Sequence, residues 1–132
     1  MSSQIDIQYV TQILSEVSEK LKKLIKEDEK SIESWIKIIS QPKFNLINYL
    51  IYFILKPSIS KEDKESIFLI FSNILIFNPL SVKQFQSHES FINLLISYIT
   101  NSKKENGTLD IYAINILSYL FSIEQYKDYI NN

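Results

Sequence analysis

The chain has 132 residues, with 14 Lys against 15 Asp and Glu, a formal net charge of -1, no Arg, no Cys and one Gly. The absence of Cys excludes disulfides, Cys-ligated zinc and thiol nucleophiles, and a single Gly excludes the glycine-rich loops that bind phosphate. A near-zero net charge argues against a protein that binds nucleic acid or that binds a membrane through a polybasic patch, because such proteins need an excess of Lys and Arg. The length and the hydrophobic content of 45% are typical of one globular domain.

The first six residues carry no basic group and no apolar run, so the sequence does not predict a signal peptide. Together with the absence of Cys, this favours a cytoplasmic or nuclear location. The longest uncharged stretch, 66–82, contains Asn73, Asn78 and Pro79. It is shorter than the roughly 20 residues that span a bilayer, so we expect no transmembrane segment and no membrane partner.

The first half of the chain predicts three helices. Apolar residues recur in steps of three and four near the start, which predicts a helix over about 5–26 with one narrow apolar seam and a charged opposite face. A shorter helix over 31–40 ends before Pro42. The stretch 44–55 is uncharged and apolar on nearly every side, which predicts a helix buried by its neighbours and ended by Pro57.

Cap and breaker residues divide the second half. Ser60, with Asp63 three residues later, forms a cap signature for a helix that continues to Phe77 and ends at Asn78-Pro79. A second signature is formed by Ser122 and Gln125. The elements expected after Pro79 are a short helix over 80–85, a helix from 87–90 to 100, a polar loop over 101–108, and helices over 109–121 and 124–130. No segment favours a strand, so the predicted class is all-α.

The aromatic residues divide into core and surface candidates. Most Phe residues lie in or beside uncharged helical runs, so we expect them in the core: Phe44, Phe53, Phe68, Phe71, Phe77, Phe85, Phe91 and Phe121. Tyr residues are better surface candidates, because a Tyr can be half-buried with its hydroxyl in water. The candidates are Tyr49, Tyr52, Tyr98, Tyr112, Tyr119, Tyr126 and Tyr129.

The chain matches itself at a separation of 45 to 46 residues. Residues 46–54 align with 91–99, with identities at Ile47, Asn48, Leu50, Ile51 and Ile54. The helices that follow align as 67–75 with 113–121, and both copies share the order of buried helix, polar loop, capped helix and short helix. A helical repeat of this period predicts stacked helical layers.

Two segments of the repeat resemble the third-helix signature of armadillo units. These are 71–75 (Phe-Ser-Asn-Ile-Leu) and 117–121 (Leu-Ser-Tyr-Leu-Phe), while 80–99 resembles the short first helix, turn and apolar second helix of such a unit. Over residues 44–130 the chain therefore resembles the armadillo-like or HEAT-like α-solenoid family, and its first 40 residues match more weakly. The turn Gly of the family is absent, since Ser87-His88-Glu89 stands in its place.

This resemblance implies a short right-handed α-solenoid of about two to three helical repeats. The whole chain, 1–132, is then a single helical-repeat domain. Its repeats are 44–87 and 88–132, preceded by N-terminal helices or a partial repeat over 1–43.

The resemblance also implies a binding face. In peptide-binding members of the family the third-helix Asn holds the backbone of the ligand, and Asn73 matches that position, whereas Tyr119 replaces Asn in the next copy. We expect Asn73, Ile76, Tyr112 and Tyr119 to lie toward a protein partner. The function implied is a non-catalytic protein–protein interaction or scaffold module. The alternative is a structural subunit of a larger multiprotein assembly, whose apolar ends are buried by partner chains.

Residues that could carry catalysis or hold a metal do not form a known pattern. His88 is the only His and has no partner at motif spacing, so we expect a solvated turn residue. Glu62 and Asp63 lie at a helix start, where carboxylates stabilise the helix dipole. We therefore predict no enzymatic activity, no metal site and no cofactor.

A basic patch formed by Lys20, Lys22, Lys23 and Lys26 suggests phosphate binding. Between residues 16 and 30, however, five Lys meet five Asp or Glu, so the segment has zero net charge. Without Arg there is also no guanidinium fork for a phosphate or a base. The pattern favours a solvated helix face over a nucleic-acid or anionic-lipid site.

Overall fold

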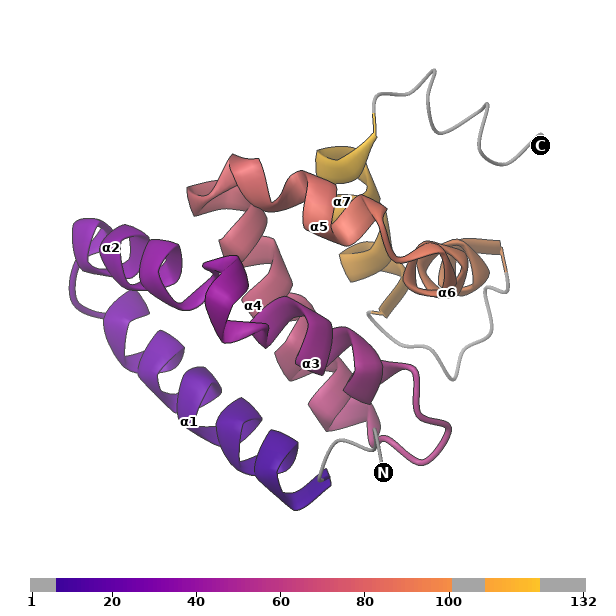
Figure 1. Ribbon diagram of the computed structural model, residues 1–132, viewed down its shortest axis with the longest axis horizontal. Coiled ribbons are helices and arrows are strands. Elements are labelled where there is room, and N and C mark those ends of the chain that lie inside the picture. Colours follow the sequence, from indigo (N-terminus) through magenta and orange to yellow (C-terminus); the bar gives the residue numbers. More distant parts are fainter. Residues whose placement is uncertain (1–6, 101–108, 122–132) are drawn as a thin grey trace.

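The computed structural model of the protein describes residues 7–100 and 109–121, and every regular element within these ranges is helical (Figure 1). The elements are α1 (Ile7–Ile25), α2 (Glu29–Ile39), η1 (Pro42–Phe44), α3 (Leu46–Ile54), α4 (Lys61–Phe77), η2 (Pro79–Ser81), α5 (Val82–Gln86), α6 (Glu89–Thr100) and α7 (Leu109–Leu120), where η marks a 3-10 turn. The predicted all-α class is confirmed. The predicted loop over 101–108, the helix over 124–130 and the cap at Ser122 lie outside the described residues.

Local capping explains where two of the helices begin. The Ser60 hydroxyl accepts a hydrogen bond from the backbone N–H of Asp63 at 3.1 Å, as the cap signature predicts. α2 begins two residues earlier than expected, because Asp28 caps it by accepting from the backbone N–H of Lys30 at 3.2 Å. Asp28 lies within a run of charged residues, 26–30, just before the expected start of the helix.

The connection between α2 and α3 also differs from the prediction. The helix expected over 44–55 begins at Leu46, because η1 and a left-handed residue precede it. That residue is Asn45, with φ of 55°, a conformation that Asn tolerates better than most side chains. Phe44 therefore belongs to a short exposed turn and not to the buried helix.

α4 is the central helix of the fold. It packs against α1, α2 and α3, and also against α7. Figure 1 shows α4 between the N-terminal helices α1 and α2 and the C-terminal helices α6 and α7. Six of its side chains are buried: Ile67, Phe68, Ile70, Phe71, Ile74 and Leu75. At about 1.5–3 kcal/mol for each buried side chain of this size, α4 supplies a large part of the hydrophobic core.

The first helix contributes one narrow seam, as its spacing predicts. Val10, Leu14, Leu21 and Leu24 are buried, and the side chains on the opposite face of α1 are exposed. α1 uses this seam to pack on α2, α3 and α4. The α1 helix thus covers one side of the central helix.

A cluster of three phenylalanines joins α4, α5 and α6. The ring of Phe71 lies 4.9 Å from that of Phe85 and 5.4 Å from that of Phe91, both in nearly perpendicular arrangements. All three rings are fully buried. Such edge-to-face pairs add about 0.5–1.5 kcal/mol each beyond the burial of their area. The expected core placement of these three residues is confirmed.

Two aromatic expectations are wrong. Phe44 is 49% exposed in η1, with the Lys43 ammonium 5.2 Å from the centre of its ring. Tyr98 is buried on α6, where its ring meets the edge of Phe68 at 6.0 Å, and this burial raises the pKa of its hydroxyl. Both residues lie in uncharged runs of the sequence. The absence of charge does not show which positions of such a run are buried and which are exposed, and this explains both errors.

Within residues 7–100 and 109–121, no single helix has both the length and the apolar composition to cross a bilayer. α4 and the helical segment 79–86 pass that test only as a pair, and the chain bends by 114° between them.

Candidate functional site

The four predicted partner-binding residues lie on two helices that pack against each other. Asn73 and Ile76 belong to α4, and Tyr112 and Tyr119 belong to α7. Ile76 is 49% exposed and Tyr119 is 45% exposed, so both side chains are accessible to a partner.

The side chains of Asn73 and Tyr112 each make a contact with another residue of the fold. The amide nitrogen of Asn73 donates to the Leu69 carbonyl at 2.9 Å, one turn earlier on the same helix. The Tyr112 ring stacks on Phe68, with ring centres 6.1 Å apart and planes 24° apart. Of the four residues, Ile76 and Tyr119 therefore present the most side chain to solvent.

The outward side of α7 carries apolar residues that sequence reasoning missed. Ile111 is 57% exposed and Ile114 is 51% exposed. With Asn115, Ser118 and Tyr119, which are also exposed, they recur in helical steps of three and four. We call these five residues the α7 outer face.

The inward side of the same helix explains why the outer face was missed. Leu109, Ala113, Ile116, Leu117 and Leu120 are buried against α4, α5 and α6. Since apolar residues cover both sides of α7, its pattern has no amphipathic contrast to show which side faces solvent. α7 contains more apolar residues than one buried side of a helix can hold. This excess is the signal in the sequence that could have revealed the outer face.

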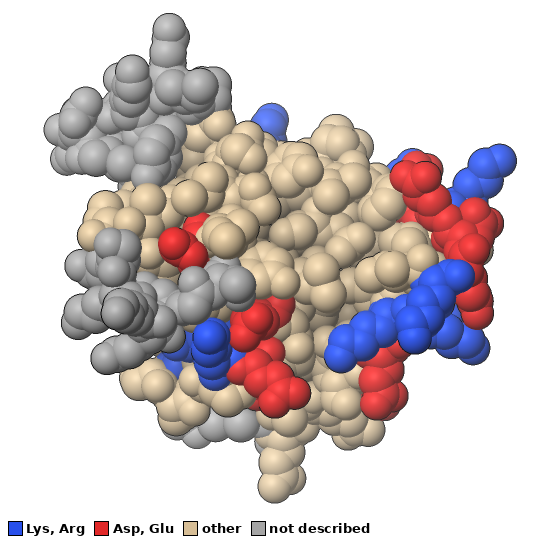
Figure 2. Space-filling model, turned by 180° about the vertical axis from the view of Figure 1, so that it is seen from behind, with Lys and Arg blue, Asp and Glu red and all other residues tan. Residues whose placement is uncertain are grey.

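The described residues of the C-terminal half, to which the α7 outer face belongs, carry little charge. Among the described residues from 66 to 121, the only Lys, Asp or Glu side chains are Lys83, Glu89 and Asp110. Figure 2 shows the back of the molecule, where charged side chains form one group at the right and another at the lower left, and a wide uncharged area covers the upper middle. A partner can therefore approach without removing many charges from water.

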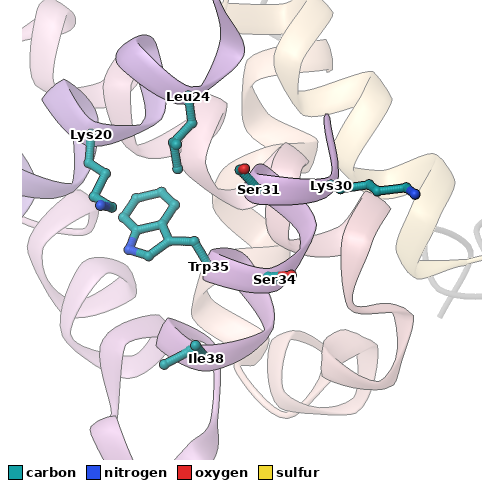
Figure 3. Close-up of a pocket in the computed structure, with 7 residues that line it drawn as sticks. All are labelled: Lys20, Leu24, Lys30, Ser31, Ser34, Trp35 and Ile38. Atoms are coloured by element: carbon teal, nitrogen blue, oxygen red, sulfur yellow. The ribbon is translucent and has the colours of Figure 1, made fainter. Parts of the chain in front are cut away.

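A groove of about 440 Å³ lies between α1 and α2, at the charged end of the molecule. Figure 3 shows Trp35 at its centre, with Leu24 and Lys20 of α1 directed toward the indole. The Lys20 ammonium is 5.9 Å from the centre of the Trp35 ring. We call this the Lys20–Trp35 groove; its lining residues are Lys20, Leu24, Lys30, Ser31, Ser34, Trp35 and Ile38.

His88 is not simply a solvated turn residue. Its Nε2 lies 2.7 Å from Oδ1 of Asn48 on α3, forty residues away in sequence, and partial burial lowers the pKa of the ring. Among the described residues, no three His, Asp or Glu side chains gather closely enough to hold a metal ion. We therefore interpret His88 as a contact between α3 and the start of α6.

Comparison with protein-family models, with curated proteins and with solved structures finds no match for this chain.

Proposed function

We propose that this chain is a non-catalytic protein–protein interaction module, and that its partner packs against the α7 outer face. The observation that carries the proposal is the pair of half-exposed isoleucines, Ile111 and Ile114, on one side of a helix in a part of the chain whose described residues carry very little charge. Exposed apolar side chains that recur along one helix face are a common feature of protein interfaces. The partner we infer is an apolar, weakly charged helix of another protein.

An armadillo-like arrangement is part of this proposal. In each proposed repeat the second helix packs on the third, as α3 does on α4 and α6 on α7. The two third helices, α4 and α7, also pack on each other. Contacts of this kind support a stacking of the repeats 44–87 and 88–132. In such an array α7 is the third helix of the repeat 88–132, and its outer side carries the exposed Ile111 and Ile114.

The test compares two matched substitutions. Ile114 on α7 and Ile25 on α1 are 51% and 52% exposed, so a change to Glu at either position costs the fold similarly little. The tagged wild-type chain, Ile114→Glu and Ile25→Glu are used to purify partners from the source cells. We expect the same protein to be recovered with wild type and Ile25→Glu, and to be lost with Ile114→Glu. Equal recovery with both variants would contradict an interface on α7.

A second candidate function is that of a subunit in a larger multiprotein assembly. The exposed apolar residues at several places on the surface favour it, above all Leu80, which is 89% exposed at the bend after α4. Light scattering after gel filtration separates the two functions. A soluble monomer supports the interaction module, whereas self-association that disappears only with partner chains supports the subunit.

A further inference from the structure

The Lys20–Trp35 groove is a second place where this chain can bind a ligand, and it is independent of α7. It lies between α1 and α2, whereas the proposed protein interface belongs to the last described helix. Its volume is about 440 Å³ and it is largely open to solvent, so it suits a segment of chain lying across it better than an enclosed small molecule.

The walls of the groove offer an apolar surface. Leu24 forms part of the buried core below it, and Trp35 is partly buried with its indole directed toward the groove (Figure 3). Ile38 is 55% exposed at the rim, one turn after Trp35. An apolar side chain placed among these three would leave water and would meet a rigid aromatic ring.

Lys20 gives the groove a charged edge. Among the described residues, no ion pair forms at Lys20. Its ammonium is held near the Trp35 ring, at 5.9 Å from the centre. Ser31 and Ser34 add hydroxyls to the lining, whereas the Lys30 ammonium points away from Trp35 in Figure 3. The groove therefore combines an apolar floor with one available cation.

We propose that this groove binds a peptide segment that places an apolar side chain on Trp35 and a neighbouring carboxylate on Lys20. The carboxylate complements a cation that forms no ion pair within the described part of the chain, and the apolar side chain covers the exposed part of the indole. An anionic membrane fits less well, because the segment 16–30 has zero net charge and gives no long-range attraction to such a surface. A phosphate ligand fits less well because the chain contains no Arg.

Trp35 provides the readout, since it is the only Trp of the chain. The probe is a blocked decapeptide with Leu-Glu-Leu-Glu at its centre and Gly and Ser elsewhere, titrated while the Trp35 emission is recorded. The control probe carries Gln in place of both Glu. Two variants are compared with the wild type: Lys20→Gln, and Lys22→Gln as a matched control at an exposed position that does not line the groove.

We expect a saturable change in emission with the acidic peptide and affinity lower by about threefold to fivefold for the Gln peptide, the effect of one exposed ion pair. Lys20→Gln should weaken acidic-peptide binding by the same factor and should not distinguish the two peptides. Lys22→Gln should behave as wild type. The proposal is overturned if the acidic peptide gives no saturable change, or if Lys20→Gln and Lys22→Gln weaken binding equally. Phosphatidylserine vesicles that shift the emission when neither peptide does would assign the groove to lipid instead.

Discussion

His88 and Asn48 join two helices that are forty residues apart in sequence, with Nε2 of the imidazole 2.7 Å from Oδ1 of the amide. The Asn48 amide nitrogen donates to Oδ1 of Asn45 at 3.4 Å, which directs its oxygen toward the ring. A carbonyl oxygen only accepts, so Nε2 must carry the proton that it donates. Asn48 is also one of the residues that the two sequence repeats share.

The partial burial of His88 predicts a pH dependence of stability. Burial lowers the pKa of His88 in the folded state below its ordinary value of about 6.5, so near that pH the unfolded chain binds more protons than the folded one. The contribution of His88 to the free energy of unfolding is complete above the unfolded pKa. It is lost as the pH falls through the unfolded pKa toward the lower folded value. We expect urea-denaturation midpoints to fall as the pH falls from about 7.5 to about 5.

The control for this prediction is His88→Gln, which keeps a side chain that can donate to Asn48. No other His is present, and carboxylates titrate mainly below about pH 5, so the slope between pH 7.5 and 5 should become flatter in the variant. An equal slope in wild type and His88→Gln would assign the pH dependence to other groups.

The phenylalanine cluster predicts a large loss of stability from one substitution. Phe85→Ala removes a fully buried ring that contacts Phe71 at 4.9 Å, and we expect the free energy of unfolding to fall by about 3–5 kcal/mol. Phe44→Ala is the matched control, since this ring is 49% exposed, and should cost less than about 1 kcal/mol. Both values come from urea denaturation followed by circular dichroism. Similar losses in the two variants would mean that Phe44 is as buried in solution as Phe85.

The helices of this protein could be predicted from its sequence because their information is local. Ser60 and Asp63 lie three residues apart, so the cap on α4 is visible without knowing the fold. The apolar seam of α1 can also be recognised from the sequence, since one face of the helix is apolar and the other is charged. Such features depend only on residues that lie within a few positions of one another in the sequence.

The features that were missed depend on contacts between distant parts of the chain. The partner of His88 is forty residues away, and nothing near His88 in the sequence indicates Asn48. In α7, Ile111 and Ile116 have the same chemistry, yet one is 57% exposed and the other is buried. Only the positions of α4, α5 and α6 decide which isoleucine faces inward, so periodicity could not predict the α7 outer face.

The cap of α4 predicts a moderate loss of stability when the capping side chain is removed. Ser60→Ala removes the oxygen that accepts from the Asp63 N–H at 3.1 Å, and should lower the free energy of unfolding by about 1 kcal/mol. Ser58→Ala changes an exposed Ser just before the helix and should have an effect within about 0.5 kcal/mol. Thermal and urea denaturation of the two variants measure the difference. If Ser58→Ala were the more destabilising of the two, α4 would begin at a different residue.

The buried hydroxyl of Ser40 links the end of α2 to the end of α4 through hydrogen bonds. Ser40 donates through Oγ to the Ile36 carbonyl at 2.6 Å and accepts from the Asn78 amide nitrogen at 2.8 Å. Asn78→Ala leaves the buried hydroxyl without its donor, whereas Ser40→Ala removes the acceptor itself. Because both variants break the same hydrogen bond, their effects on stability should not add.

A double-mutant cycle measures this coupling. We expect the free energies of unfolding of wild type, Ser40→Ala, Asn78→Ala and the double variant to give an interaction energy of about 1 kcal/mol, the usual net value of a neutral hydrogen bond. Ser87→Ala combined with Asn78→Ala is the control pair, because Ser87 donates to the Gln84 carbonyl at 2.7 Å and does not contact Asn78. That pair should be additive within about 0.3–0.5 kcal/mol. Additive effects for Ser40 and Asn78 as well would show that this hydrogen bond does not hold α2 against α4 in solution.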